Sequence, residues 1–565
     1  MKKGKKLVFF AKSLSLETLL IAAIFISISI RVINLGSREF WYDEVLSLLL
    51  STGQKSAYVT PKDVPVVLAN YTLLLNLPPE SSFSDLLRTL VSLLKGIVAE
   101  PHPFLFYLSQ HFWLRLFGNS EIAQRSLNLL VSLFSIGCGY GLGRTLLGYR
   151  GGLLFAAALA TNPFFLFHSL NVRMYAPLVL WTILSAWALI QLIGVDKIKP
   201  QNTPIEHKTP LKLKQQLFWT GVLIVAVAAG CLTFYLFAYW VITLATLVLY
   251  LDRRHWWQHA LRLGTGVLIT VPWVLWGTRQ QLRNADLGRF STPDGFFATM
   301  IQHLQDVAYL LGVQLGVGDW ITSIPVWVAV TTGIFWIIVF TIGSIRLWKL
   351  GENRRLGVVL ILGIFPLFLA LIADIVGKKF TIGFGWGRSL MMILPGCLLL
   401  ITLLIQEIKK EPLYRLTATG LILIYLSISI GDYSLRPRQM FHQISDIIAT
   451  EPTTPTLIVM NSQAWGHVNR LAYYISPQYP VSLLAQESAK LAPALEKLLT
   501  SQTLPYGRII ELEVAEPVWS EQMTDNQRQE IQALMNQNFR LKKQEPLSGT
   551  MDIDQFTVNL FVKNQ

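Results

Sequence analysis

Two adjacent carboxylates near the N-terminus are the side chains best suited to chemistry. Asp43 and Glu44 follow the first long apolar run, and Trp41 and Tyr42 directly precede them. A carboxylate can take a proton from a hydroxyl group while aromatic rings stack on the apolar face of a sugar. Acidic residues are equally typical of a helix N-terminus, where the helix dipole stabilises negative charge. The residue types alone leave both interpretations open.

Basic residues in later parts of the chain could hold a phosphate. Lys378 and Lys379 precede a segment rich in glycine and aromatic residues, Arg388 follows it, and Arg173 begins another apolar run. Fixed cations stabilise the negative charge that a phosphate gains as it leaves a sugar. Basic residues are usually enriched at the cytoplasmic ends of membrane-spanning helices. An arginine at the opposite end of a span is therefore unusual, which favours a functional role for Arg388. The lysine pair fits snorkelling toward lipid headgroups equally well.

The composition predicts a membrane protein. The chain has 565 residues, of which 52% are hydrophobic and only 15% are charged. Soluble proteins have about one quarter charged residues. The net charge of +14 comes from basic residues clustered between apolar runs. Orientation in a bilayer explains this excess better than nucleic-acid binding. The three cysteines lie inside apolar runs, which excludes a disulfide framework and a zinc knuckle.

Apolar runs near 20 residues long predict about eleven membrane-spanning helices. They lie at residues 17–35, 122–147, 151–168, 174–193, 217–234, 235–251, 263–277, 322–345, 356–375, 388–405 and 416–433. Alternate connections are basic, which predicts a cytoplasmic N-terminus and a C-terminus on the other side. Residues 296–315 are compatible with an extra span or a re-entrant helix.

We expect a membrane domain at residues 1–435 and a small α/β domain outside the cytoplasm at residues 436–565. The C-terminal region alternates between strand and helix patterns, with strands expected at residues 456–460, 480–484, 508–514 and 556–562. The first outer loop, residues 36–121, contains two amphipathic runs. Both are typical of helices that lie in the membrane interface.

Four short motifs, taken in order, resemble one family of membrane enzymes. They are the segments from Arg38 to Ser47, from Pro101 to Tyr107, from Trp113 to Arg125 and from Asn171 to Ala176. Their order and spacing resemble GT-C glycosyltransferases, in the bacterial branch related to protein O-mannosyltransferases and lipid A aminoarabinose transferase (family 39-like). The resemblance runs from about residue 15 to residue 280, with weaker echoes at residues 272–273 and 388–395.

The resemblance implies roles for several residues. Asp43 would be the catalytic base or a metal-facing carboxylate, with Glu44 as its support. His102, Asn171 and Tyr175 would contact substrate, although an interfacial histidine and an amide at a helix start need no such role. Relatives usually have a glutamate in place of Asn171, so an acidic role there is lost or moved.

The sequence shows no ligand cluster that requires a metal, although a divalent metal is compatible with it. Relatives often have Thr-His-Tyr where this chain has Thr233-Phe-Tyr235, which removes one potential metal ligand. No nucleotide is needed as a cofactor.

We therefore expect an inverting glycosyltransferase of a bacterial plasma membrane, with a polyprenyl-phosphate sugar as donor. The acceptor would be a hydroxyl group of a lipid, glycan or protein on the non-cytoplasmic face, and no nucleic acid is expected as a partner. A transporter or lipid flippase with an extracytoplasmic domain is the main alternative. Because the candidate charges gather at helix ends, transport is less favoured. A third interpretation is a non-enzymatic lipid-binding or assembly protein.

Overall fold

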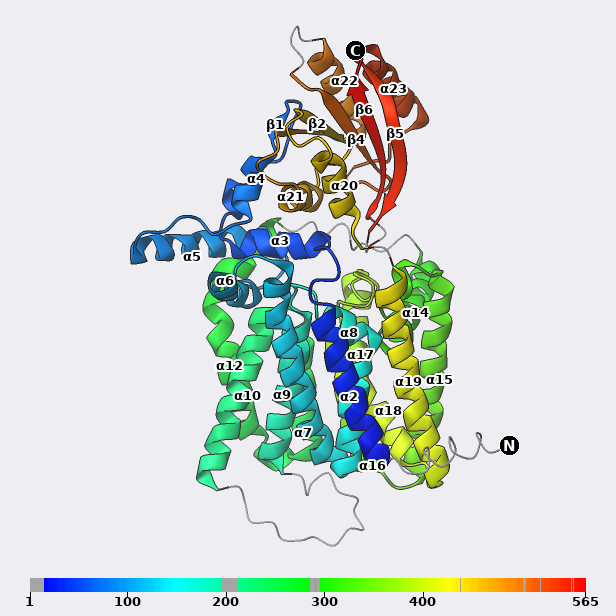
Figure 1. Ribbon diagram of the computed structural model, residues 1–565. Coiled ribbons are helices and arrows are strands. Elements are labelled where there is room, and N and C mark those ends of the chain that lie inside the picture. The colour runs from blue at the N-terminus through cyan, green and yellow to red at the C-terminus, as the bar shows by residue number, and fades with distance from the viewer. Residues whose placement is uncertain are drawn as a thin grey trace, which may run out of the picture. The chain divides into compact units, whose positions relative to one another are not determined.

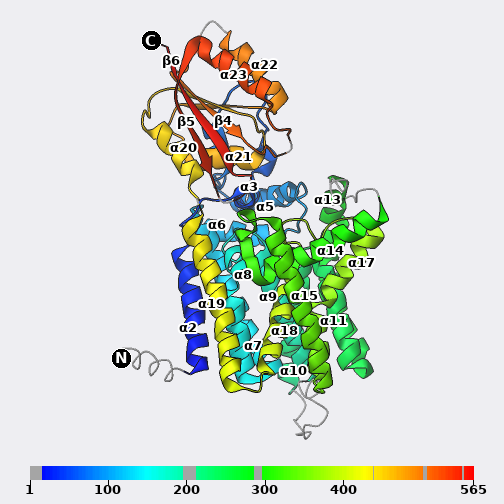
Figure 2. The same cartoon turned by 90° about the vertical axis from the view of Figure 1, so that its right-hand side faces the viewer.

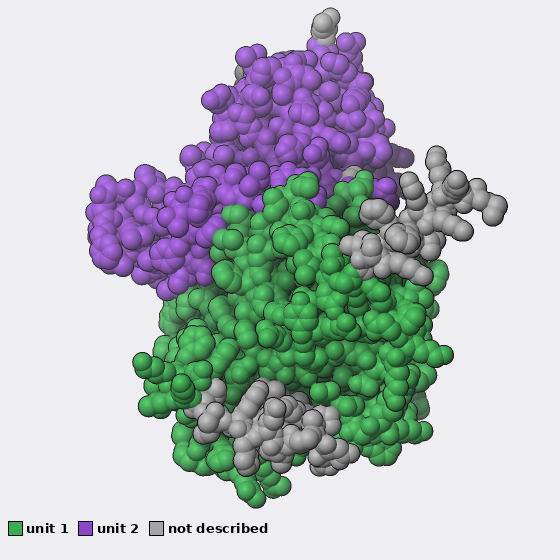
Figure 3. Space-filling view, turned by 60° about the horizontal axis from the view of Figure 1, so that its bottom comes forward, with its two compact units in different colours: residues 1–33, 98–106, 126–434 green, residues 34–97, 107–125, 435–565 purple. Residues whose placement is uncertain are grey.

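The computed structural model describes residues 15–194, 212–284, 290, 295–436, 438–500, 505–518, 520–549, 551 and 553–564. It divides the chain into two compact units (Figure 3). Unit 1 comprises Met1–Ile33, Val98–Phe106 and Ser126–Ser434, and unit 2 comprises Asn34–Ile97, Tyr107–Arg125 and Leu435–Gln565. Most of the first outer loop is thus grouped with the C-terminal region. The N-terminal lysines and the basic connection at 195–211 lie outside the described residues.

Unit 1 is a bundle of helices, most of which run along one another (Figures 1 and 2). Its longer helices are α2 (Leu16–Ile33), α7 (Glu121–Thr161), α9 (Tyr175–Ile193), α10 (Leu213–Thr233), α11 (Phe237–Leu251), α12 (Trp256–Trp273), α14 (Phe296–Gly312), α15 (Val326–Lys349), α16 (Asn353–Gly363), α17 (Phe365–Gly377), α18 (Leu394–Gln406) and α19 (Glu411–Leu435). Short helices α8 (Pro163–His168) and α13 (Arg279–Asn284) lie between them in sequence.

The helical membrane class is confirmed, and the number of spans stays a prediction. Among the described residues, seven helices are long and apolar enough to cross a membrane, or eight if α16 and α17, bent by 44°, form one span. Two expected runs merge into α7, which breaks at Gly148 because its backbone has a φ of 79°. The expected runs at α11 and α18 gave shorter apolar helices. Helix α14 covers residues 296–312 of the run at residues 296–315 and is not among the seven.

Unit 2 contains the helices of the first outer loop, α3 (Tyr42–Ser51), α4 (Ala69–Leu74), α5 (Phe83–Ile97) and most of α6 (Leu105–Phe117). Helices α5 and α6 form where the two amphipathic runs predict helices. Helix α5 buries Leu93 and Ile97 and exposes Phe83 and Leu87, which suits one apolar face against unit 2 and a second in contact with lipid. Their position in the membrane interface stays a prediction.

The C-terminal part of unit 2 folds around a six-stranded sheet with the order β1-β3-β2-β4-β6-β5 (Figure 1). The strands are β1 (Val66–Val67), β2 (Thr456–Met460), β3 (Val481–Ala485), β4 (Arg508–Val514), β5 (Phe539–Ser548) and β6 (Gln555–Lys563). The helices are α20 (Met440–Ala449), α21 (Trp465–Tyr474), α22 (Ser488–Leu499) and α23 (Asp525–Asn538). Strands β2, β3, β4 and β6 form where the sequence predicts strands.

Two strands were not predicted. Strand β5 exposes most of its side chains and contains Pro546, so it lacks the apolar alternation that marks a strand. Strand β1 has only two residues and comes from the first outer loop, where it pairs with β3 in antiparallel fashion. A segment of two residues is too short to be recognised as a strand from the sequence, although valine favours strands.

Strand β2 is the topological centre of the sheet. It is parallel to β3 on one side and to β4 on the other. Helix α22 contributes Leu491 and Leu495 to a core that includes Leu457 of β2 and Phe561 of β6. Helix α21 packs on the opposite face, where His467 contacts the ring of Phe556. The connections after β2 and β3 therefore cover opposite faces, and the carboxyl end of β2 lies at the reversal of strand order.

Candidate functional site

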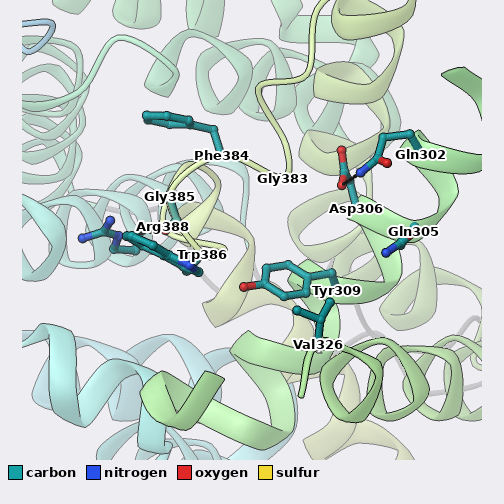
Figure 4. Close-up of a pocket in the computed structure, with 10 residues that line it drawn as sticks. All are labelled: Gln302, Gln305, Asp306, Tyr309, Val326, Gly383, Phe384, Gly385, Trp386 and Arg388. Atoms are coloured by element: carbon teal, nitrogen blue, oxygen red, sulfur yellow. Dashed lines mark hydrogen bonds between the residues drawn. The ribbon is translucent and has the colours of Figure 1, made fainter. Parts of the chain in front are cut away.

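A cavity of about 450 Å³ surrounds one of the predicted basic residues, Arg388, in unit 1. Figure 4 shows the side chains that line it. They come from α14, from the start of α15 and from the segment before α18: Gln302, Gln305, Asp306, Tyr309, Val326, Gly383, Phe384, Gly385, Trp386 and Arg388. Aromatic, amide, carboxylate and guanidinium groups thus meet in one pocket of unit 1.

The segment that precedes Arg388 is held by its neighbours in unit 1. The carboxylate of Asp374 accepts hydrogen bonds from the Thr381 hydroxyl (2.6 Å) and from the amides of Thr381 (2.8 Å) and Ile382 (3.0 Å). At the other end, the side-chain amide of Gln314 donates to the carbonyl oxygen of Gly387 (2.8 Å). These bonds fix the wall of the pocket from both sides.

Three successive residues of this wall have a left-handed backbone. Gly385 has a φ of 71°, Trp386 a φ of 51° and Gly387 a φ of 79°. Left-handed conformations are unfavourable for a bulky residue such as tryptophan, and such strain concentrates at binding and catalytic sites. A Cβ atom at Gly383 would stand 2.7 Å from a carboxylate oxygen of Asp306, so only glycine allows this close approach. Gly385 and Gly387 therefore suit a left-handed backbone, and Gly383 suits the close approach to Asp306.

The guanidinium of Arg388 lies between aromatic rings. Its carbon is 5.0 Å from the ring centre of Trp386 and 5.8 Å from that of Tyr175, and its Nε donates to the carbonyl oxygen of Gly385 (2.7 Å). The residue is 8% exposed. Cation–π contacts orient a guanidinium by its faces. The arrangement therefore presents a fixed positive charge at the cavity.

The structure brings predicted residue Tyr175 to Arg388 and places Asn171 and Arg173 on the turn before it. The Asn171 side chain is 3.1 Å from Nδ1 of His168, whose ring lies 5.2 Å from that of Tyr175. Asn128 donates to the carbonyl oxygens of Asn171 and Arg173, the latter at 2.8 Å. Asn171 thus acts within a buried network that holds the turn.

Asp306 and its neighbours were missed by the sequence analysis. The Asp306 carboxylate accepts a hydrogen bond from Gln302 (2.8 Å) one helical turn earlier in α14. Tyr309 and Gln305 complete that wall of the pocket. One signal could have found Asp306, because an ionisable residue inside an apolar run is a functional candidate by default.

His102, Lys378 and Lys379 are not among the residues that line this pocket. The imidazole of His102 stacks on Phe234 with ring centres 5.5 Å apart, and its carbonyl oxygen accepts from Gln281 (2.8 Å). Lys378 is exposed and ends α17 with a φ of 50°. The stacking of His102 fits a packing role, and the exposure of Lys378 fits contact with lipid headgroups. The substrate roles of the three residues stay predictions.

In unit 2, Glu44 is bound by one arginine. Its carboxylate accepts from Nε (2.9 Å) and Nη2 (2.8 Å) of Arg125 and from the backbone amide of Trp41 (3.1 Å). Arg125 also donates to the carbonyl oxygens of Leu35, Arg38 and Glu39 at 2.8–2.9 Å. Both side chains are fully buried. Glu44 therefore caps the start of α3, as the helix-start interpretation expects.

Asp43 differs from its neighbour because it remains half-buried at the first turn of α3. Tyr42 packs inside unit 2, where its ring lies 5.4 Å from that of His467 at 90°. A Cβ atom at Gly466 would be 2.5 Å from the Tyr42 ring. Tyr42, like the buried Trp41, therefore has a packing role in this structure rather than an open face for a sugar. The two acids therefore differ in their surroundings, because Glu44 is bound by Arg125 and Asp43 lies half-buried at the first turn of α3.

No group of three or more His, Cys, Asp or Glu side chains suitable for a metal ion occurs among the described residues. Of the two motif carboxylates, Asp43 and Glu44, the second is ion-paired with Arg125. We therefore assign no metal ligands.

Comparisons with known proteins agree with this architecture. A family model described as dolichyl-phosphate-mannose-protein mannosyltransferase matches residues 101–200. The structure is similar to that of ArnT from Cupriavidus metallidurans bound to undecaprenyl phosphate, at 12% identity and a TM-score of 0.51, covering 96% of this chain and 98% of that chain. The apo state of the same protein gives 10% identity, a TM-score of 0.51 and coverage of 96% and 97%.

The Archaeoglobus fulgidus oligosaccharyltransferase in complex with Zn and sulfate is less similar, at 12% identity and a TM-score of 0.48, covering 94% of this chain and 72% of that chain. No curated protein sequence gives a significant match. The resemblance to GT-C fold membrane glycosyltransferases is confirmed, because the fold is shared with ArnT and three of the four motifs lie in or overlap the matched residues 101–200.

Proposed function

We propose that this protein transfers a sugar from a polyprenyl-phosphate donor to an acceptor hydroxyl group, with inversion at the anomeric carbon. The observation that carries the proposal is the Arg388 pocket, where a buried guanidinium lines a cavity of about 450 Å³. The fold supports it, because ArnT, which shares the fold, binds undecaprenyl phosphate. A polyprenyl phosphate is therefore a fitting leaving group for this chain.

Arg388 would bind the phosphate of the donor. As the glycosidic bond breaks, its electron pair moves to a phosphate oxygen and the charge of the leaving group grows. A guanidinium held in place by aromatic faces meets that charge without reorganisation, which stabilises the transition state more than the ground state. Trp386 and Tyr175 would keep the guanidinium oriented, and Asp306 would accept hydrogen bonds from sugar hydroxyl groups.

Asp43 would be the general base. In a single displacement, the acceptor oxygen attacks the anomeric carbon while its proton passes to a carboxylate oxygen of Asp43. Glu44 would act as a positioning residue, because its carboxylate is held by Arg125 and by the amide of Trp41. It fixes the start of α3 and therefore the direction in which Asp43 points.

The orientation of the chain belongs to the same proposal. Every second connection between the apolar runs is basic, so we infer that the N-terminus is cytoplasmic and that unit 2 lies on the non-cytoplasmic side of the membrane. The membrane would be a bacterial plasma membrane. Membrane-impermeant labelling of intact cells, or spheroplasts where an outer membrane is present, should reach a cysteine introduced at Ser520 and miss one introduced at Gln201. The opposite result contradicts this orientation.

A transfer assay tests the function directly. Purified protein is mixed with a radiolabelled polyprenyl-phosphate sugar and candidate acceptors, and released polyprenyl phosphate is measured. Arg388→Ala should lower turnover about 10- to 100-fold, since a charged hydrogen bond contributes roughly 1.5–3 kcal/mol. Arg388→Lys should restore only part of it, because a fork of donors becomes a point charge.

The matched control is Arg283→Ala, which removes an exposed arginine of α13 that does not line the pocket. Equal turnover in the Arg388 and Arg283 variants would contradict the role of Arg388. Movement of intact donor across proteoliposome membranes without consumption would instead support the transporter or flippase alternative.

A further inference from the structure

A second cavity, of about 380 Å³, lies wholly within unit 2. It is lined by residues that follow β2, β3 and β4 and by a segment of the first outer loop: Lys55, Tyr58, Thr60, Gln463, Ala464, Trp465, Glu487, Val518 and Ser520. None of these residues belongs to the Arg388 pocket, which lies in unit 1. The cavity has the size typical of small-molecule sites.

The position of this cavity in the sheet is the position at which open α/β sheets bind ligands. Gln463 and Trp465 follow the carboxyl end of β2, and Glu487 follows that of β3. Helices α21 and α22, which begin there, cover opposite faces of the sheet. The crevice at such a reversal of strand order is open at the carboxyl ends because the two connections diverge.

Gln463 fixes the two sides of the cavity to each other. Its side-chain NH₂ donates to the carbonyl oxygens of Pro61 (2.6 Å) and Ala485 (3.3 Å) and to the amide oxygen of Gln486 (3.0 Å). Pro61 belongs to the first outer loop, Ala485 is the last residue of β3, and Gln486 follows it.

Two aromatic rings and one ammonium group form the wall from the first outer loop and α21. The rings of Tyr58 and Trp465 lie 6.3 Å apart at 54°. The Nζ of Lys55 is 4.3 Å from the centre of the Trp465 ring and 5.2 Å from that of Tyr58. Cation–π contacts hold this ammonium beside aromatic surface. The wall therefore combines apolar faces with hydrogen-bond donors.

The charges of the lining restrict the ligand. Lys55 supplies one positive charge and Glu487 one negative charge, while Gln463, Thr60 and Ser520 are neutral. The two lining charges balance, and the Glu487 carboxylate is also ion-paired with Lys490 (2.7 Å), so no net charge of the lining selects an anion. An organic cation would compete with Lys55 for the rings. A neutral ring with hydroxyl groups suits both charges, because a hydroxyl donates to a carboxylate and accepts from an ammonium. Its C–H faces suit the aromatic rings.

We propose that this cavity is a binding site for a neutral pyranose sugar, formed by the first outer loop and the carboxyl ends of β2 and β3. Trp465 and Tyr58 contact the ring faces, Glu487 accepts from sugar hydroxyl groups, and Lys55 and Gln463 complete the hydrogen bonds. The site is distinct from the pocket assigned to transfer, so it stands whether or not the transfer reaction is confirmed.

Ligand-detected NMR on the full-length protein tests this site. Saturation transfer is measured to methyl glycosides of glucose, galactose, mannose and N-acetylglucosamine, and to glucuronate. Inorganic phosphate serves as a competitor. The protein is held in a detergent without a sugar headgroup, because maltoside detergents would occupy the site. Glu487→Gln and Lys55→Met should each weaken binding of a neutral glycoside about tenfold, as loss of a charged hydrogen-bond partner does.

The controls are Glu496→Gln and Lys497→Met, which change the same residue types on α22 away from the cavity. They should bind as the wild type does, and thermal melting of all four variants separates lost binding from lost folding. The proposal is overturned if no neutral glycoside binds, if only glucuronate binds or phosphate displaces the glycoside, or if the folded cavity variants bind like the controls.

Discussion

The two units each bury an arginine, and the difference between them separates a structural arginine from a candidate site. Arg125 in unit 2 uses all its N–H groups inside the protein, with bonds to both oxygens of Glu44 and to three backbone carbonyls. Arg388 in unit 1 lies against the faces of two aromatic rings and lines a cavity. Burial of a charge is common to both, so it is the open cavity that indicates function.

The largest expected effect concerns Asp43, the neighbour of Glu44 in α3. Asp43→Asn keeps the size of the side chain but cannot accept a proton, and a positioned base contributes about 10²- to 10⁴-fold to rate. We expect turnover to fall by at least a hundredfold with normal expression and thermal stability. Near wild-type transfer would remove Asp43 as the base, and a collapse in expression would give it a structural role instead.

Removal of Arg125, the structural arginine of unit 2, should reduce the stability of the fold. Arg125→Ala leaves the Glu44 carboxylate buried without its partner, and the broken pair should cost about 3–5 kcal/mol. Thermal unfolding and limited proteolysis of the purified protein measure this loss. The control is Arg528→Ala, which breaks solvent-exposed pairs with Glu513 and Asp525 and should cost less than about 1 kcal/mol. Equal losses would show that the Arg125 cluster is not a structural centre.

A milder change should sharpen the role of the aromatic faces at Arg388. Trp386→Phe keeps a ring but weakens the cation–π contact, which is strongest for tryptophan and contributes about 0.5–2 kcal/mol. We expect turnover to fall about 2- to 30-fold, with the KM for the lipid-linked donor raised. Phe384→Leu, at an exposed ring of the same segment and the same pocket, is the comparison variant. A larger loss of turnover in Phe384→Leu than in Trp386→Phe would show that the ring of Phe384 is the more important one.

The smallest effect is expected from a buried carboxylate of unit 2 that has no arginine partner. Burial raises the pKa of Glu511 to about 7, although Asn559 donates to its carboxylate (3.0 Å). The folded state therefore keeps a proton that the unfolded state loses, so stability is highest below about pH 4.5 and falls as the pH rises toward 7. Melting temperatures across this range should decline in the wild type and remain flatter in Glu511→Gln. A pH dependence that persists in the variant would assign it to other groups.

The sequence predicted those features that depend on local pattern. Helices such as α9 and α10 and strands such as β2 and β4 follow from apolar runs and their period. Arg388, which lines the pocket, stood out as an unusual charge at the expected start of an apolar run, and its role stays a prediction. The partnership of Glu44 with Arg125 could not be read in this way, because 81 positions separate the two residues. The same holds for Asp306, whose place in the pocket depends on how α14 meets Gly383.

The pairing of β1 with β3 has a consequence for the order in which the protein can fold during synthesis. Val66 pairs with Leu483, so 417 residues must be added to the chain before the pair can form. At a synthesis rate of about 5–20 residues per second, β3 is made roughly 20–80 s after β1. During that interval most of the membrane helices are made and inserted. Completion of the sheet in unit 2 is therefore a late event, and a cell would gain from a chaperone that shields this loop until then.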